Sequence, residues 1–396
     1  MKSGFLMIVP IYAKVSINFI GNYFMQTLDI HNLKANDIIR KCVHCGFCLA
    51  TCPTYQLLGN ELDSPRGRIY LIKSALENNE SSADSLQHLD RCLTCRACET
   101  TCPSGVEYGH LLDIGRAAIE DKRALWQKTF RFAVRKFLTT PVLFNMVGFL
   151  FRHSSIQTPV IKPKISGKKV LLLGGCVQPT LAPNINHSVK NILTKLGYKV
   201  EETPQKQCCG AIDQHLSAND EALQKIKKNI DAWHSFEVII SSTSGCGVMV
   251  KDYGSLFDKD DVYYQKAQTV SQNTCDIAQF LADKDLSIFK TFNQTITYHS
   301  PCTMQHGQQL GGLVESILKR LGYEPSTVAD AHLCCGSAGT YSIFQPKLSQ
   351  QLKINKLKNL QASSPEMIVT ANIGCLMHLQ KGTKIPVKHW IELLGN

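Results

Sequence analysis

The chain has 396 residues, of which 44% are hydrophobic and 19% are charged. This composition is that of a core-forming globular protein and excludes a disordered one, and the length favours two or three domains. The sequence holds 17 cysteines and a net charge of +11. Because the cysteines cluster in metal-ligand spacings, we expect a reducing compartment and not a secreted, disulfide-stapled protein.

The first 24 residues are an ambiguous segment. Lys2 precedes an apolar run from Gly4 to Ala13, which resembles a weak signal peptide but is too short to span a bilayer. Export would also place free cysteines in an oxidising space. We therefore interpret Met25 as the natural start and residues 1–24 as a non-native upstream extension; the alternative is a flexible arm.

Two copies of one cysteine pattern follow, Cys42–Pro53 and Cys92–Pro103, each with the spacing C-x2-C-x2-C-x3-C-P. Bacterial ferredoxins with two clusters have this spacing, and the cysteine before the proline binds the other cluster. Zinc knuckles and disulfides are disfavoured, because zinc sites rarely use four cysteines so closely spaced. The predicted ligands are crossed between the runs: Cys42, Cys45, Cys48 and Cys102 for the first [4Fe–4S] cluster, and Cys92, Cys95, Cys98 and Cys52 for the second.

About forty residues separate the two runs, and residues 69–76 have helical periodicity. Small ferredoxins use shorter hairpins here, so this region resembles the all-α ferredoxin domain of succinate dehydrogenase-type iron–sulfur subunits. Arg66 and Arg68 either donate hydrogen bonds to cluster sulfur or to a partner, or they cap and solubilise a loop. His44, inside the first run, is predicted to pack near the cluster without binding iron.

A basic stretch runs from Lys122 to Lys169, with eleven Lys or Arg and no Asp or Glu. Within it, Phe130, Val134 and Phe137 lie at helical spacing among basic residues, and Pro141–Phe151 is almost wholly apolar. Such a helix is typical of contact with an anionic membrane surface. The alternatives are partner docking, or a helix packed on the neighbouring domain with its basic face in solvent. Nucleic acid is disfavoured because no recognition motif accompanies the stretch.

The rest of the chain contains an internal duplication. Four cysteines occur in the same order twice, and a glycine follows each adjacent pair: Cys176, Cys208, Cys209 and Cys246, then Cys302, Cys334, Cys335 and Cys375. Matching cysteines are 126 residues apart, or 129 for the last pair. Strand and helix patterns alternate in both copies, which predicts an α/β sandwich with a mainly parallel sheet and cysteines gathered at strand ends.

An adjacent Cys-Cys pair before glycine is a poor disulfide but a good chelate, so these eight cysteines are possible ligands of an additional iron–sulfur or metal site. The pattern resembles the pair of cysteine-rich CCG domains found in heterodisulfide reductases, in which each half can carry C…CCG…CxxC and hold an iron–sulfur cluster. The final CxxC is incomplete here, because Met249 and His378 stand at its last position. His299, His306 and His378 are candidate supplementary ligands, and Cys275 is expected to be a structural thiol.

From Met25 to the C-terminus, the arrangement resembles the iron–sulfur subunits of glycolate oxidases. Arg40–Gln56 and Ser64–Ile72 carry the resemblance, together with the second cysteine run and the CCG pair. It implies an iron–sulfur electron-transfer subunit of a 2-hydroxy-acid (glycolate) oxidoreductase complex, cytoplasmic and peripheral on the inner membrane. Electrons would pass from FAD on partner subunits, where the substrate site would lie, to a membrane acceptor such as quinone.

The predicted fold is an all-α ferredoxin-like two-cluster domain followed by duplicated α/β CCG domains. The predicted boundaries are 1–24 for the extension, 25–121 for the ferredoxin domain, 122–166 for the basic amphipathic linker, 167–290 for the first CCG domain and 291–396 for the second.

The sequence contains no dinucleotide fingerprint, Ser-His-Asp order or Walker loop, which favours an electron carrier. Close alternatives are the iron–sulfur subunits of anaerobic glycerol-3-phosphate and lactate dehydrogenases. A different class is a heterodisulfide reductase-like catalyst that reduces a disulfide or quinone at a CCG cluster. A third is a scaffold whose CCG halves hold zinc or nothing.

Overall fold

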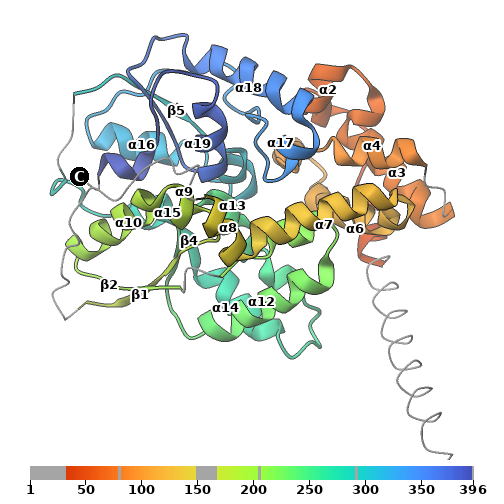
Figure 1. The fold of residues 1–396 in the computed structure, drawn as a ribbon, viewed down its shortest axis with the longest axis horizontal. Helices are drawn as coiled ribbons and strands as arrows, with labels where there is room; N and C mark the ends of the chain where they lie inside the picture. Colours follow the sequence, from red (N-terminus) through yellow and green to blue (C-terminus); the bar gives the residue numbers. More distant parts are fainter. Residues whose placement is uncertain (1–32, 79–81, 149–166, 204–206, 290–292, 395–396) are drawn as a thin grey trace, which may run out of the picture.

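The computed structural model describes residues 33–78, 82–148, 167–203, 207–289 and 293–394. A helical unit that carries both cysteine runs lies at one side, and two α/β units lie beside it (Figure 1). The predicted upstream extension, residues 1–24, and the part of the basic stretch from 149 to 166 lie outside the described residues.

The helical unit is built around two long helices. Residues 33–40 are helical; the further elements are η1 (Phe47–Leu49), α2 (Pro53–Leu58), η2 (Glu61–Asp63), α3 (Pro65–Asn78), α4 (Ala83–Asp90), α5 (Ala97–Thr101), α6 (Tyr108–Ile119) and η3 (Glu120–Lys122). Ile69 and Ile72 of α3 pack in one core with Tyr108, Leu111 and Leu112 of α6. Within each helix these core residues recur at spacings of three or four positions, as on one face of a helix. Gly115 allows close approach, since a Cβ there would lie 2.4 Å from Ile72 Cγ1.

Two helices, α7 (Leu125–Thr139) and α8 (Pro141–Gly148), follow the helical unit (Figure 1). α7 ends before Pro141, because a proline disfavours helical backbone in the residue before it. Its buried residues are Arg131, Arg135 and Thr139, so the helix packs through its arginines. The alternative in which this helix packs with its basic face in solvent is therefore wrong for Arg131 and Arg135. Among the described residues, no helix is both long enough and apolar enough to cross a bilayer.

Ion pairs explain why α7 packs through arginine. Arg131 Nη1 lies 3.5 Å from Asp90 of the helical unit. One turn later, Arg135 Nη1 lies 3.0 Å from Asp213 Oδ1 and its Nη2 lies 3.0 Å from Glu221 Oε1, both in the first α/β unit. α7 thus joins the two units through carboxylates that lie outside the basic stretch, which contains no Asp or Glu of its own.

The first α/β unit has a four-stranded parallel sheet in the order β2-β1-β3-β4. Its elements are β1 (Lys169–Leu173), α9 (Gln178–Leu181), α10 (Pro183–Lys195), β2 (Lys199–Glu202), α11 (Ala211–His215), α12 (Asn219–Trp233), β3 (Ile239–Ser241), α13 (Ser244–Lys251), η5 (Tyr253–Ser255), α14 (Tyr264–Asn273), β4 (Thr274–Asp276) and α15 (Ile277–Leu281). Val170 and Leu172 enter one core and Leu171 and Leu173 the other, because both faces of a parallel sheet are covered.

The second α/β unit repeats this topology with a parallel sheet in the order β5-β6-β7. Its elements are β5 (Ile296–His299), the π-helical turn η6 (Thr303–Gly307), α16 (Leu313–Arg320), α17 (Tyr341–Phe344), α18 (Pro346–Leu360), β6 (Met367–Thr370), α19 (Ile373–Gln380), β7 (Val387–His389) and η7 (Trp390–Leu393). A single parallel bridge, Thr297–Ser326, stands where β2 stands in the first unit. The predicted duplication is confirmed.

The two α/β units share one hydrophobic core, which includes Ile192 and Leu281 from the first unit and Val314 and Ile391 from the second. Polar contacts also join them beside the cysteine-bearing helices. Ser244 Oγ at the start of α13 lies 2.8 Å from Thr303 Oγ1. The two units therefore pack as a single body.

Candidate iron–sulfur centres

The two cysteine runs have matching backbone conformations. His44 and Gly46 in the first run have φ of 54° and 85°, and Thr94 and Arg96 in the second have φ of 52° and 60°. These residues flank the second cysteine of each run, Cys45 or Cys95, and lie in the left-handed region. Left-handed non-glycine residues are strained and are common where a loop holds a ligand. They curl each run into a loop whose cysteines line a pocket.

The first cluster pocket is lined by the four cysteines predicted for the first cluster, Cys42, Cys45, Cys48 and Cys102, and also by Cys98. Its rim is apolar and open, since Val43 is 67% exposed and Phe47 is 61% exposed. Burial raises the pKa of Cys48 to about 11. The thiol is therefore protonated until a metal cation compensates for the loss of its proton.

The second cluster pocket is lined by the four cysteines predicted for the second cluster, Cys52, Cys92, Cys95 and Cys98. It is deeper than the first, because Cys52, Cys92 and Cys98 are all buried. The Tyr108 hydroxyl donates to Cys92 Sγ at 3.6 Å. Burial raises the pKa of Cys98 well above its usual value. An all-thiol donor set of this density fits an iron–sulfur cluster.

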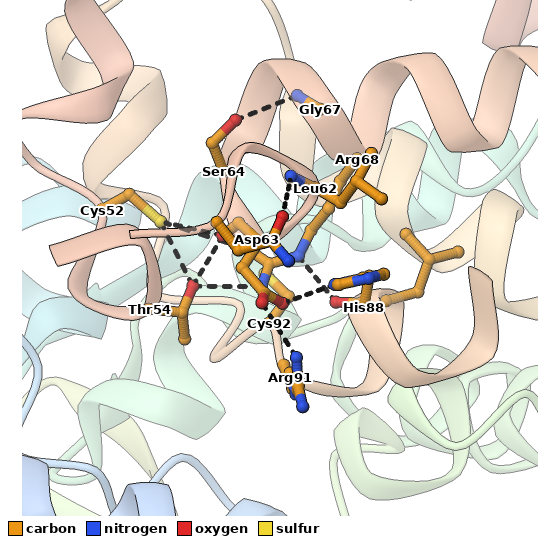
Figure 2. Close-up of polar contacts among 12 residues, drawn as sticks. Cys52, Thr54, Leu62, Asp63, Ser64, Gly67, Arg68, His88, Arg91 and Cys92 are labelled. Atoms are coloured by element: carbon orange, nitrogen blue, oxygen red, sulfur yellow. Dashed lines mark hydrogen bonds and ion pairs between the residues drawn. The ribbon is translucent and has the colours of Figure 1, made fainter. Parts of the chain in front are cut away.

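A buried polar network borders the second cluster pocket (Figure 2). Asp63 is fully buried and accepts from Arg91 Nη1 at 2.9 Å, and it lies 2.9 Å from His88 Nδ1. Arg68 is 1% exposed, donates from Nε to the His88 carbonyl at 2.7 Å, and reaches Cys52 Sγ with Nη1 at 4.0 Å. Arg68 thus lies against a predicted ligand of the second cluster, and its donation to a cluster sulfide stays a prediction.

Arg66 has a different role from Arg68. Its Nε pairs with Glu61 at 2.5 Å, and its Nη1 donates to the His44 carbonyl at 3.3 Å. It therefore braces the first cysteine loop from outside and fits the predicted role of capping a loop. The His44 side chain is exposed and lines the first cluster pocket.

In the first α/β unit, the four predicted cysteines form a chain of contacts. Cys208 interacts with Cys176 and with Cys209, and Cys209 interacts with Cys246. The interaction with the Cys176 thiol is the largest cause that holds the pKa of Cys208 well below its usual value. Gly210 follows with φ of 88°, which completes the turn. The four thiols therefore interact in sequence, from Cys176 through Cys208 and Cys209 to Cys246.

Two hydrogen bonds to backbone carbonyls fix the Cys208-Cys209 turn of the first unit. Tyr253 donates its hydroxyl to the Cys209 carbonyl at 2.8 Å, and Asn229 Nδ2 donates to the Cys208 carbonyl at 3.0 Å. Cys275 lies on β4, and burial raises its pKa to about 11.

The second α/β unit gathers its cysteines in the same order. Cys302 Sγ lies 3.8 Å from Cys334 Sγ. Cys335 interacts with both Cys334 and Cys375. Gly336 has φ of 88°, and a Cβ there would lie 2.6 Å from the Ser349 carbonyl oxygen, so only glycine fits this turn.

The three candidate histidines of the second unit differ in their surroundings. His299 is buried, and burial lowers its pKa to about 3. His378 Nε2 lies 3.3 Å from Ser349 Oγ, and burial lowers its pKa to about 4. His306 Nδ1 lies 2.9 Å from Thr100 Oγ1 of the helical unit. His306 therefore joins two units, and the sequence assigned it no such role.

The second cluster pocket faces the cysteines of the second α/β unit. Leu93 and Cys95 share one hydrophobic cluster with Cys302, Cys334 and Tyr341. Burial is the largest cause that raises the pKa of Cys95, and electrostatic repulsion from Cys302 is the next. The helical unit also contacts the first α/β unit, where Arg96 Nη2 pairs with Asp252 at 2.5 Å. The second cluster pocket is thus in direct contact with the cysteine-bearing part of the second α/β unit.

Sequence analysis did not identify Asp63 or Tyr108 as site residues. Asp63 contacts His88 and Arg91, which are 25 and 28 positions away, so no local motif signals the network. Tyr108 is 16 positions from Cys92. The run from Asp63 to Arg68 was the one sequence signal of this network, because it places an acidic and two basic residues at the start of a helix. Charged side chains that become buried need partners of opposite charge.

Comparison with known proteins agrees with these sites. A 4Fe-4S dicluster domain model matches residues 38–106, and a cysteine-rich domain model matches residues 170–251 and 296–380. The lactate utilization protein A of Bacillus licheniformis is 26% identical over 239 residues, 58% of this chain and 99% of the relative. The probable glycolate oxidase iron-sulfur subunit of Bacillus subtilis is 29% identical over 435 residues, 95% of this chain and 96% of the relative.

The glycolate oxidase iron-sulfur subunit of Escherichia coli K12 is 46% identical over 385 residues, which cover 91% of this chain and 95% of the relative. Identity of this extent spans the dicluster domain and both cysteine-rich domains together. The chain belongs to the family of glycolate oxidase iron–sulfur subunits.

Proposed function

We propose that this chain is the electron-transfer subunit of a glycolate oxidase complex, taking electrons from an FAD-binding partner and passing them to a membrane acceptor such as quinone. The observation that carries the proposal is the placement of the two cluster pockets, one opening at the surface and the other facing the second α/β unit. A [4Fe–4S] cluster, when bound, takes up and releases one electron at a time, whereas the flavin handles two.

The ligand sets proposed for the ferredoxin-type sites are crossed between the runs. Support comes from the pocket linings, in which Cys102 joins the first run's cysteines and Cys52 joins those of the second. We further propose the all-α ferredoxin-like class for this domain, since each regular element within residues 33–78 and 82–148 is a helix. The domain boundaries 25–121, 122–166, 167–290 and 291–396 are proposed on the positions of these elements and of the matched ranges.

The eight CCG cysteines are proposed as ligands of additional iron–sulfur or other metal sites. Their thiols form connected chains in both α/β units, which is support from donor chemistry. All four cysteines of the second unit are buried, which favours electron carriage over direct reaction with a bulky disulfide substrate. The carrier is therefore preferred to a heterodisulfide reductase-like catalyst.

The test of the proposed function uses the chain co-expressed with FAD-binding partner subunits and purified without oxygen. We expect glycolate to bleach the visible iron–sulfur absorption of the complex, with D-lactate as a comparison substrate. The chain alone is expected to show no bleaching, because it lacks a two-electron acceptor. Reduction of the isolated chain by glycolate would assign catalysis to this chain and contradict the proposal.

Membrane contact is proposed for the start of α7. Leu125 is 79% exposed and Trp126 is 69% exposed, and Lys128, two positions further on, donates from Nζ to the Asp121 carbonyl at 2.9 Å. Arg131 and Arg135 are bound to internal carboxylates, so they are unsuited to contact lipid headgroups. An exposed tryptophan with a neighbouring lysine matches the composition of interfacial helices on anionic lipid.

Replacing Leu125 and Trp126 together with Gln is expected to lower the membrane-bound fraction at least tenfold, because each apolar side chain contributes about 1.5–3 kcal/mol when buried. Sedimentation with vesicles of anionic lipid measures the fraction, in low and high salt. Val262→Gln is the control, since Val262 is 86% exposed in the first α/β unit. Unchanged sedimentation of the double variant would remove this face from consideration.

A further inference from the structure

One ring nitrogen of His299, at the end of β5, lacks a hydrogen-bond partner. His299 is 2% exposed. Its Nδ1 lies 3.0 Å from Thr370 Oγ1, whereas its Nε2 is buried and has no hydrogen-bond partner among the described residues. A buried polar nitrogen without a partner is unfavourable unless something else satisfies it.

Two cysteine sulfurs lie close to the His299 ring. A ring nitrogen of His299 and the sulfurs of Cys335 and Cys375 all lie within 4.8 Å of one another. Cys335 is adjacent in sequence to Cys334, whose sulfur lies 3.8 Å from that of Cys302. The imidazole therefore belongs to the same donor cluster as the four thiols of the second α/β unit.

Thr370 orients the imidazole in the way a metal ligand requires. His299 and Thr370 are paired in register at the ends of β5 and β6, and Thr370 is fully buried. When Nδ1–H donates to Thr370 Oγ1, the tautomer leaves the lone pair on Nε2. Metal-bound histidines commonly use their other ring nitrogen in this manner, which fixes both tautomer and ring direction.

The first α/β unit has no counterpart to this histidine. The duplication places Leu173 at the position of His299, and Leu173 is packed in the hydrophobic core beside Cys209. The donor cluster of the first unit, within the described residues, is made of thiols. The two units therefore offer different ligand chemistry although their folds match.

We propose that His299 binds the metal group of the second α/β unit through Nε2, so that this unit holds an iron–sulfur group with mixed thiolate and imidazole ligands. The first unit would use thiolates alone. This inference rests on the proposed function, because it takes the CCG cysteines as iron ligands. Imidazole in place of a thiolate raises the reduction potential of an iron–sulfur centre, so His299 would hold the potential of the second unit above the value that a cysteine at this position would give.

The experiment uses full-length protein, prepared without oxygen and labelled with ¹⁵N-histidine. Pulsed EPR during a reductive titration is expected to detect a histidine-nitrogen coupling in the unsubstituted protein. His299→Leu is expected to abolish this coupling; leucine is the residue that the same fold position holds in the first unit. His299→Cys is expected to keep the iron, lose the coupling and lower the ratio of reduced to oxidised group at least tenfold at fixed potential, about 59 mV for one electron.

The matched control is His378→Gln. His378 lies three residues after Cys375, but its Nε2 already has Ser349 Oγ at 3.3 Å, so the coupling is expected to persist. Loss of the coupling in His378→Gln, or its persistence in His299→Cys, would overturn the assignment of His299. The cysteine variant decides the matter even if the leucine variant does not fold.

Failure of the proposed function gives a different result. If the unsubstituted protein contains iron for the two ferredoxin-type clusters alone, about eight per chain, the CCG cysteines are not iron ligands, and the iron–sulfur assignment of the second unit is wrong together with the role of His299. If iron exceeds that amount and no histidine coupling is found, the CCG ligands stand and only His299 is excluded.

Discussion

Serine in place of Cys52 is expected to abolish the EPR signal of the second cluster and to leave that of the first unchanged, whereas serine in place of Cys48 is expected to do the reverse. The two cysteines lie in the same run, four positions apart, yet they line different pockets. A serine hydroxyl is a poor replacement for a thiolate, which iron–sulfur clusters require. Low-temperature EPR of the reduced protein distinguishes the two signals.

Cys275→Ser is the matched control for these substitutions. Cys275 lies on β4 and lines neither cluster pocket, so its replacement is expected to retain both signals. If Cys48→Ser and Cys52→Ser damage the same signal, the ligand sets follow the runs and the crossed assignment is wrong. Iron and acid-labile sulfide, measured on the same samples, show whether a missing signal reflects a missing cluster.

Asp63→Asn is expected to destabilise the protein by about 3–5 kcal/mol, the usual effect of removing one partner from a buried ion pair. Asp63 is fully buried and lies within hydrogen-bonding distance of His88 and Arg91, and Arg68 Nη2 lies 3.4 Å from its Oδ1. Asparagine keeps the shape but leaves the buried Arg68 guanidinium without a carboxylate. The midpoint of thermal bleaching of the iron–sulfur absorption, measured without oxygen, reports the change.

Glu77→Gln provides the comparison for Asp63→Asn within the same domain. Glu77 pairs with Lys73 at 3.9 Å, with both side chains about half exposed. Exposed pairs of this kind contribute about 0.3–0.5 kcal/mol. A bleaching midpoint for Asp63→Asn no lower than that of Glu77→Gln would show that the network contributes little to stability.

Much of the architecture was predictable because it depends on short-range patterns. The spacing within each cysteine run places its three leading cysteines in one loop, and the repeat of Cys-Cys-Gly identifies the duplication. The strand that precedes Cys176 and the one that precedes Cys302 are both present, as β1 and β5. Short runs of this kind that are bounded by turn signals are consistent with buried parallel strands, and their length of four or five residues favours a strand over a helix.

The partners of individual charges were not predictable. Arg131 and Arg135 belong to a stretch that looks like a basic surface in the sequence, but their carboxylate partners lie 41 and 78 positions away. Sequence periodicity reports which residues share a helix face and not what that face meets. The same limit applies to His299, whose significance depends on Cys335 and Cys375 meeting it in space.

The division of each pocket between two cysteine runs has a consequence for biogenesis. Cys52 leaves the ribosome with the first run but lines the second cluster pocket, and Cys102 lines the first pocket from the second run. With the proposed crossed ligand sets, neither run would present a complete set of thiols until both had been synthesised and α3 and α6 had packed. Iron delivery would then depend on the folding of the whole domain, and an arrested or truncated chain would expose incomplete sites to premature oxidation.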